Sequence, residues 1–104
     1  MDQVIESVRC ELERRIAAVR RRAATAKRSD LACEVDAIRL VAHRAGLAPA
    51  VTVTHLLDSA LAEGQQGALV QDWLGVLGDA VRCERTDPQA CAAFAAACQV
   101  RIAG

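Results

Sequence analysis

Aromatic residues are almost absent from this sequence: its 104 residues include one tryptophan, one phenylalanine and no tyrosine. That scarcity excludes a core built around large rings, although 53% of the residues are hydrophobic. The core must therefore consist of alanine, leucine, valine, isoleucine and cysteine. Each buried alanine removes little apolar area from water, so such a core stabilises a monomer only modestly. We expect marginal monomer stability, or a partner chain that adds buried surface.

Long apolar runs and paired-cysteine motifs are also absent. The longest apolar run, Ala90 to Cys98, is much shorter than the roughly 20 residues of a membrane span. The sequence has five cysteines, an odd number, and no Cys-x-x-Cys motif. We expect no secretory leader before them, so reduced thiols are the simplest interpretation. Cys91 and Cys98 lie two helical turns apart, about 10 Å, which is too far for a shared metal ion or a disulfide. We predict a cytoplasmic protein without a membrane segment, whose cysteines act as small core residues.

The chain has no net charge, but its charges are unevenly distributed. A formal charge of zero argues against a protein that acts through a bulk electrostatic field. Residues 1–52 carry ten basic and seven acidic side chains, whereas residues 53–104 carry three and six. Between Arg14 and Ser29 there are seven basic residues and no acidic one. The first half is therefore basic and the second half acidic.

Apolar residues recur at intervals of three and four through most of the chain, which predicts helices. The predicted helices cover residues 2–27, about 30–45, 49–63, 68–84 and 88–102. With no convincing strand and only short connections, this pattern predicts an all-α fold, a compact bundle of four to five helices with a long N-terminal helix. No linker is long enough to separate two domains, so residues 1–104 are predicted to form a single helical-bundle domain.

Capping signals set the expected helix ends. Ser29 or Asp30 is expected to cap the second helix, and Gly46 to end it in the left-handed conformation. Pro49 suits the first turn of the third helix, and Asp87 followed by proline suits the start of the last.

Two glycines, Gly75 and Gly78, fall inside the predicted fourth helix. Each costs up to about 1 kcal/mol relative to alanine. That cost is tolerable if a neighbouring helix packs closely against the bare backbone.

The corner at residues 38–61 is the one stretch that suggests a functional motif. A helix-turn-helix needs a small residue packed between its helices, a glycine in the turn and apolar anchors in the second helix. Ala42, Gly46 and Leu47 meet these needs. Over about seven residues, Val41-Ala-His-Arg-Ala-Gly-Leu47 resembles the helix-turn-helix of the LacI-type repressor family. The resemblance implies a DNA-binding transcriptional regulator.

Beyond the turn the sequence departs from that pattern. The expected anchor positions fall on Thr52 and His55, whereas the apolar Val53 and Leu56 come one residue later. The second helix offers Thr52 and His55 as base-contacting candidates, but no Arg, Lys, Asn or Gln before Gly64. The alternative is an ordinary corner between two helices.

A row of arginines follows the exposed side of the first predicted helix. Arg14, Arg21 and Arg28 recur every seven residues, opposite the apolar stripe, and Arg22 lies in the same basic stretch. Such a row could neutralise nucleic-acid phosphates, with binding that weakens steeply as salt rises. It could equally contact an acidic protein surface, including the acidic half of another copy, or it could be a solvated helix face.

His43 is the candidate phosphoacceptor of a third hypothesis. A histidine phosphotransfer domain is also a small helical bundle with one exposed histidine on a helix. The residues that follow His43, Arg44-Ala45-Gly46, depart from the lysine and glycine spacing that is usual there. His43 and His55 have no third ligand of convincing spacing, so no metal site is predicted.

The leading functional hypothesis is protein–protein association without catalysis. No nucleophile–base arrangement, carboxylate pair or phosphate loop stands out, so no catalytic residue and no cofactor is predicted. The Ala- and Cys-rich last helix, the glycines of the fourth helix and the opposite charges of the two halves favour a homo-oligomer or a regulatory protein partner. DNA binding and histidine phosphotransfer are the alternatives.

Overall fold

A computed structural model describes the backbone of residues 2–103 and the side chains of residues 3–100. These residues form an all-α fold, which confirms the predicted class. The helices are α1 (Asp2–Arg22), α2 (Arg28–Arg44), α3 (Ala48–Ala62), α4 (Ala68–Arg82) and α5 (Pro88–Ala103). Within residues 2–103, no helix is both long enough and apolar enough to span a membrane.

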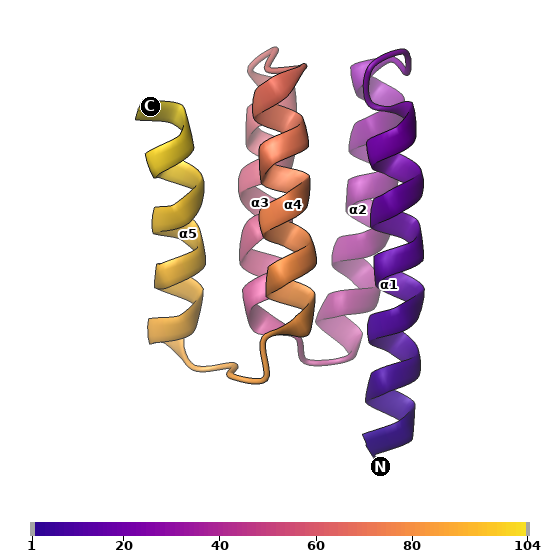
Figure 1. The fold of residues 1–104 in the computed structure, drawn as a ribbon, viewed down its shortest axis with the longest axis vertical. Helices are drawn as coiled ribbons and strands as arrows, with labels where there is room; N and C mark the ends of the chain where they lie inside the picture. Colours follow the sequence, from indigo (N-terminus) through magenta and orange to yellow (C-terminus); the bar gives the residue numbers. More distant parts are fainter. Residues whose placement is uncertain (1, 104) are drawn as a thin grey trace.

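The first four helices form an up-and-down array, as Figure 1 shows. In this array α1 packs against α2 and α4, whereas α3 packs against α2, α4 and α5. Helices α1 and α3 therefore lie diagonally opposite each other. The N-terminal turns of α1 extend beyond the end of the bundle, and α5 covers the edge formed by α3 and α4 (Figure 1).

The core is built from aliphatic residues and small residues, as the composition predicts. Trp73 is the one large aromatic side chain that is buried among the described residues. Three alanines, Ala42, Ala50 and Ala80, are fully buried, so α2, α3 and α4 each have a point where a neighbour can approach closely. The largest fully buried side chains are Leu12, Leu31, Ile38, Leu57, Leu74 and Leu77.

The corner between α2 and α3 has the expected C-terminal cap. Gly46 has a φ of 75°, and its N–H donates to the carbonyl of His43 while the N–H of Leu47 donates to that of Ala42. These two hydrogen bonds are those of a Schellman motif, which needs a left-handed residue at the glycine position. Pro49 then lies in the first turn of α3, where its missing N–H costs nothing.

The predicted end of the first helix and the predicted cap of the second are wrong. Helix α1 ends at Arg22 rather than near Lys27, because residues 23–25 form a turn. The N-cap of α2 is Lys27, which makes no side-chain capping hydrogen bond, and Ser29 and Asp30 already lie in the first helical turn. Ala23 is buried although it lies in this turn, so the apolar stripe of the first helix continues past the end of the helix itself.

Candidate interaction surfaces

The outer face of α5 is the first candidate surface. From Pro88 to Val100 this helix contains no charged residue. Its inner side buries Ala90 and Cys98, and its exposed residues up to Val100 are Pro88, Gln89, Ala92, Ala93, Ala96, Gln99 and Val100. Val100 is 66% exposed. A helix at the surface of a protein normally has charged residues on its solvent side, so this face is unusual for one that meets only water.

Helix α5 is attached to the bundle along one side only. It packs against α3 and α4, and the indole N–H of Trp73 on α4 donates to the carbonyl oxygen of Cys98 at 3.1 Å. This hydrogen bond is buried, and Phe94 and Ala97 pack against the core beside it. The side of α5 that faces away from the bundle is left open (Figure 1).

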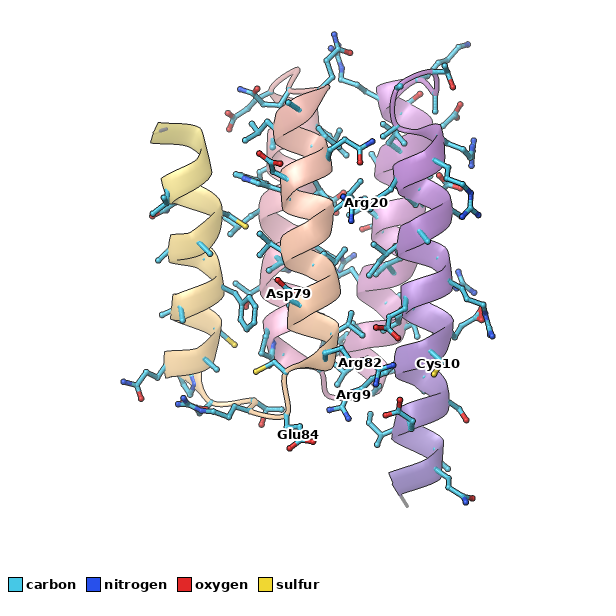
Figure 2. The ribbon with its side chains drawn as sticks, in the orientation of Figure 1. Arg9, Cys10, Arg20, Asp79, Arg82 and Glu84 are labelled. Carbon is cyan, nitrogen blue, oxygen red and sulfur yellow. The ribbon has the colours of Figure 1, made fainter. Side chains whose placement is uncertain are left out.

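A groove between α1 and α4 is the second candidate surface. It is an open hollow of about 310 Å³, with Ile16 and Leu74 among its lining residues. Gly75 and Gly78 lie along its α4 side. Figure 2 shows Arg20 and Arg82 reaching into the space between the two helices from opposite ends, with Asp79 on the α4 side.

No neighbouring helix packs closely against the two glycines among the described residues. A Cβ at Gly78 would have no atom within 4 Å, and the nearest atom to one at Gly75 is the Arg20 guanidinium, 3.9 Å away. The backbone of α1 therefore does not pack closely against either glycine. The cost of two glycines inside a helix is not offset by packing within the monomer.

Replacing Gly78 with alanine should raise the free energy of unfolding by about 0.5–1 kcal/mol, because alanine has the higher helix propensity and fits the open space. Gly46→Ala is the matched control. At its φ of 75° an L side chain is strained, so that variant should lose about 1–2 kcal/mol. Urea unfolding followed by far-UV circular dichroism measures both changes. At a protein concentration where the chain is monomeric, a destabilised Gly78→Ala variant would contradict the open groove.

The charges of the groove are divided between its two ends. At one end Arg82 forms ion pairs with Glu6 and Glu13, including a 2.8 Å hydrogen bond from its Nε to Glu13. These hydrogen bonds hold the pKa of both carboxyls below the ordinary value. Asp79 lies near the same end without an ion pair among the described residues. This end therefore has more carboxylates than guanidinium groups.

Arg20 gives the opposite end of the groove its positive charge. Its Nε donates to the side-chain oxygen of Gln71 at 3.3 Å, and the amide nitrogen of Gln71 donates to the Arg20 carbonyl at 2.8 Å. In the part of the chain with described side chains, Arg20 has no carboxylate within ion-pair distance. The groove is thus positive at one end and negative at the other.

The residues of the predicted DNA-binding site do not share one surface. Arg14 and Arg21 are exposed on α1, opposite its buried stripe. Thr52 and His55 lie on α3, the helix diagonal to α1, and Thr52 is half-buried. Because diagonal helices of a four-helix array expose opposite corners, Arg14 and Arg21 face a different side from the α3 residues (Figure 1). Arg28 lies in the first turn of α2 rather than on the first helix, so the predicted arginine row is interrupted.

Two of the predicted arginines are engaged in contacts within the bundle. Arg22 forms an ion pair with Glu34 of α2, and Arg28 donates to the carbonyl oxygen of Gly64 at 3.3 Å. Arg14 pairs with Glu11 of its own helix. These contacts are exposed, so they contribute little to stability, but they tie α1 to α2 and α2 to the α3–α4 connection.

The corner at residues 38–61 forms a helical hairpin. Helices α2 and α3 lie antiparallel and side by side (Figure 1), whereas a helix-turn-helix has its second helix crossing the first at about 90–120°. Most of α3 is buried between its neighbours, including Val53, Thr54 and Leu57. The corner therefore has the turn of a DNA-reading motif but a different arrangement of its helices. DNA binding itself stays a prediction.

His43 is exposed in the last turn of α2, beside an open hollow of about 370 Å³. The other residues that line this hollow are uncharged: Gly46, Leu47, Ala48, Val51 and Thr52. No charged side chain of the lining assists His43, and its role as a phosphoacceptor stays a prediction.

Sequence reasoning missed a pair of carboxyls on α2 and α3. Asp36 and Asp58 line one open hollow, together with Cys33. Burial, and then the neighbouring negative charge of Asp36, raise the pKa of Asp58 above its ordinary value. Asp36 itself is paired with Arg39 at 2.9 Å, whereas Oδ1 of Asp58 is buried without a hydrogen-bond partner. The two residues are 22 positions apart, so only the pairing of the helices reveals them.

Asp58→Asn should stabilise the protein at neutral pH and not in acid. Because the pKa of Asp58 is raised on folding, its charged form destabilises the folded state above that pKa, and the penalty disappears below the ordinary value of 3.8. The side chain is only partly buried, so solvent screening limits the expected gain to about 0.5–1 kcal/mol at pH 7. Urea unfolding of both proteins at pH 7 and pH 3 measures the difference. Asp72→Asn removes an exposed carboxylate of α4 as the control, and an equal gain in that variant would contradict the assignment.

The predicted core role of the cysteines holds at one position. Cys98 is fully buried, whereas Cys10 and Cys33 are exposed and Cys83 and Cys91 are half-exposed. The prediction that the cysteines are core residues is therefore wrong for Cys10 and Cys33. These two cysteines lie outside the buried stripes of α1 and α2. Among the residues with described side chains, no group of three or more potential ligands is arranged to hold a metal ion.

Comparisons with known proteins do not assign these surfaces to a family. No protein-family model, no curated protein and no solved structure matches this chain. The functional argument therefore rests on the residues of the chain itself, and above all on the uncharged outer face of α5.

Proposed function

We propose that this protein is a non-enzymatic helical bundle that acts by associating with a second copy of itself, through the outer face of α5. The observation that carries this proposal is the composition of α5, which lies at the edge of the bundle and has no charged residue from Pro88 to Val100. A helical stretch with apolar residues on every side is normally buried between two packed layers. Among the described residues, only α3 and α4 pack extensively against α5, and both lie on its inner side.

The residues of this face suit a symmetric contact between two copies. Ala92, Ala93 and Ala96 are small and exposed, so a second helix can approach the α5 backbone closely. A two-fold axis would place the same face of the second copy against it, and such an isologous contact is the commonest form of homo-oligomer. The contact would also add the buried apolar area that an alanine-rich core lacks.

Ala96→Glu tests the proposal. Ala96 is exposed, and glutamate has good helix propensity, so the monomer fold should persist. In a two-fold contact each copy would bring a carboxylate into an apolar interface, and we expect self-association to weaken by at least about tenfold. Multi-angle light scattering over a range of protein concentrations measures the change.

Ala62→Glu is the matched control. It places the same new charge at an exposed position of another helix, α3. We expect it to self-associate as the unmodified protein does. If Ala96→Glu and Ala62→Glu gave the same molar mass at every concentration, the outer face of α5 would not be the interface.

A further inference from the structure

We propose that the groove between α1 and α4 is a second self-association face, which takes the same groove of another copy in an antiparallel arrangement. The proposal extends the proposed function, but it is carried by different residues and does not depend on the α5 contact. Arg20 of each copy would pair with Asp79 of the other.

The shape of the groove makes a close contact between two copies possible. Gly78 has open space where a side chain would be, and only the Arg20 side chain lies near Gly75. Two helices can approach each other closely where both lack side chains at the crossing point. The two glycines are three residues apart, on one side of α4, so a second copy of α4 could cross there.

Charge complementarity selects the occupant and its direction. One end of the groove has Glu13 and Asp79 beside Arg82, and the other end has Arg20 without a carboxylate partner in the described part of the chain. A second copy placed parallel to the first would bring like ends together. A second copy placed antiparallel brings each positive end over a negative end, which favours this arrangement.

The register of the antiparallel arrangement follows from the glycines. Suppose that Gly75 of one copy lies opposite Gly78 of the other. The turn of α4 from Gln71 to Gly75 in the first copy then faces the turn from Gly78 to Arg82 in the second copy. Arg20 contacts Gln71 and lies nearest Gly75, so it faces the turn of the second copy that contains Asp79. Arg20 and Asp79 both line the groove, and Arg20 is at the level of Gln71, two turns of α4 away from Asp79, as this pairing requires.

Two different two-fold faces on one chain would build assemblies larger than a dimer. The α5 face and the groove lie on different sides of α4, so one copy could use both at once (Figure 1). The result would be a closed tetramer if the axes meet suitably, or a longer chain of copies if they do not. Blocking either face alone should leave a dimer.

The test is a mixing experiment in the Ala96→Glu background, in which the α5 contact is blocked. We expect Ala96→Glu alone to form a dimer through the groove. Adding Arg20→Glu places glutamate against Asp79 twice in each dimer, and adding Asp79→Arg places arginine against Arg20 twice. Each of these double variants should dimerise at least tenfold more weakly. An equimolar mixture of the two should recover the dimer, because both contacts of the mixed dimer are then between opposite charges.

Sedimentation velocity at several concentrations measures Ala96→Glu, the two double variants and their mixture. Circular dichroism checks that each variant is folded. Arg21→Glu in the same background is the control, since Arg21 is exposed on the outer side of α1; it should dimerise as Ala96→Glu does. Failure of the mixture to dimerise would overturn the groove proposal, and so would a fully monomeric Ala96→Glu protein. That last result leaves the α5 contact standing, whereas an Ala96→Glu protein as large as the unmodified one would instead count against α5.

Discussion

Replacing Trp73 with alanine is expected to lower the free energy of unfolding by about 3–5 kcal/mol, the usual cost of removing a buried aromatic side chain. The indole is buried on α4, and its N–H donates to the carbonyl oxygen of Cys98. The substitution therefore opens a cavity and removes the hydrogen bond that joins α4 to α5. Because small domains are stable by only about 5–15 kcal/mol, this loss is a substantial part of the total stability and should lower the urea midpoint clearly.

Trp73→Phe separates the two contributions. Phenylalanine retains most of the apolar volume but cannot donate a hydrogen bond, so we expect a smaller loss of about 1–3 kcal/mol. Urea unfolding followed by far-UV circular dichroism compares the variants, since Trp73 is the only tryptophan and its fluorescence is lost in both. If Trp73→Ala were as stable as the unmodified protein, α5 would not be held as the structure shows.

Ala50→Leu is expected to lower the free energy of unfolding by about 1–3 kcal/mol, because it inserts a larger side chain into a packed core. Ala50 is fully buried in α3, the helix that packs against α2, α4 and α5. Alanine and leucine have similar helix propensities, so the loss would come from packing rather than from the helix itself.

Ala62→Leu is the control for this substitution. It makes the same change at the exposed end of α3, and its effect on stability should be within about 0.5 kcal/mol. Thermal unfolding followed by circular dichroism measures both. An Ala50→Leu variant more stable than the control would show that the core has unfilled space, contrary to a close approach of helices at the buried alanines.

The helices and their corners could be predicted from the sequence because these features depend on near neighbours in the chain. The buried positions of α1, including Leu12, Ile16 and Val19, are those of its apolar stripe. The cap at Gly46 depends on one residue that tolerates a positive φ. The end of α1 was not predicted, because the apolar stripe continues to Ala23 whereas the helix ends at Arg22.

The surfaces could not be predicted, because they depend on which helices are neighbours. Periodicity places Arg14 and Thr52 on the exposed or half-buried sides of their own helices, but it cannot show that α1 and α3 are diagonal. The raised pKa of Asp58 requires α2 beside α3. The open groove requires α1 beside α4 at a distance that leaves Gly78 uncovered. The composition of α5 and the two glycines of α4 were visible in the sequence alone, but the surfaces that they form were not.

The central claim is that this chain associates with itself, and sedimentation equilibrium of the unmodified protein tests it most directly. A single chain has a mass of 11.1 kDa. We predict a weight-average mass that rises with concentration to at least twice that value at micromolar to millimolar protein. A mass of one chain throughout this range would contradict the account.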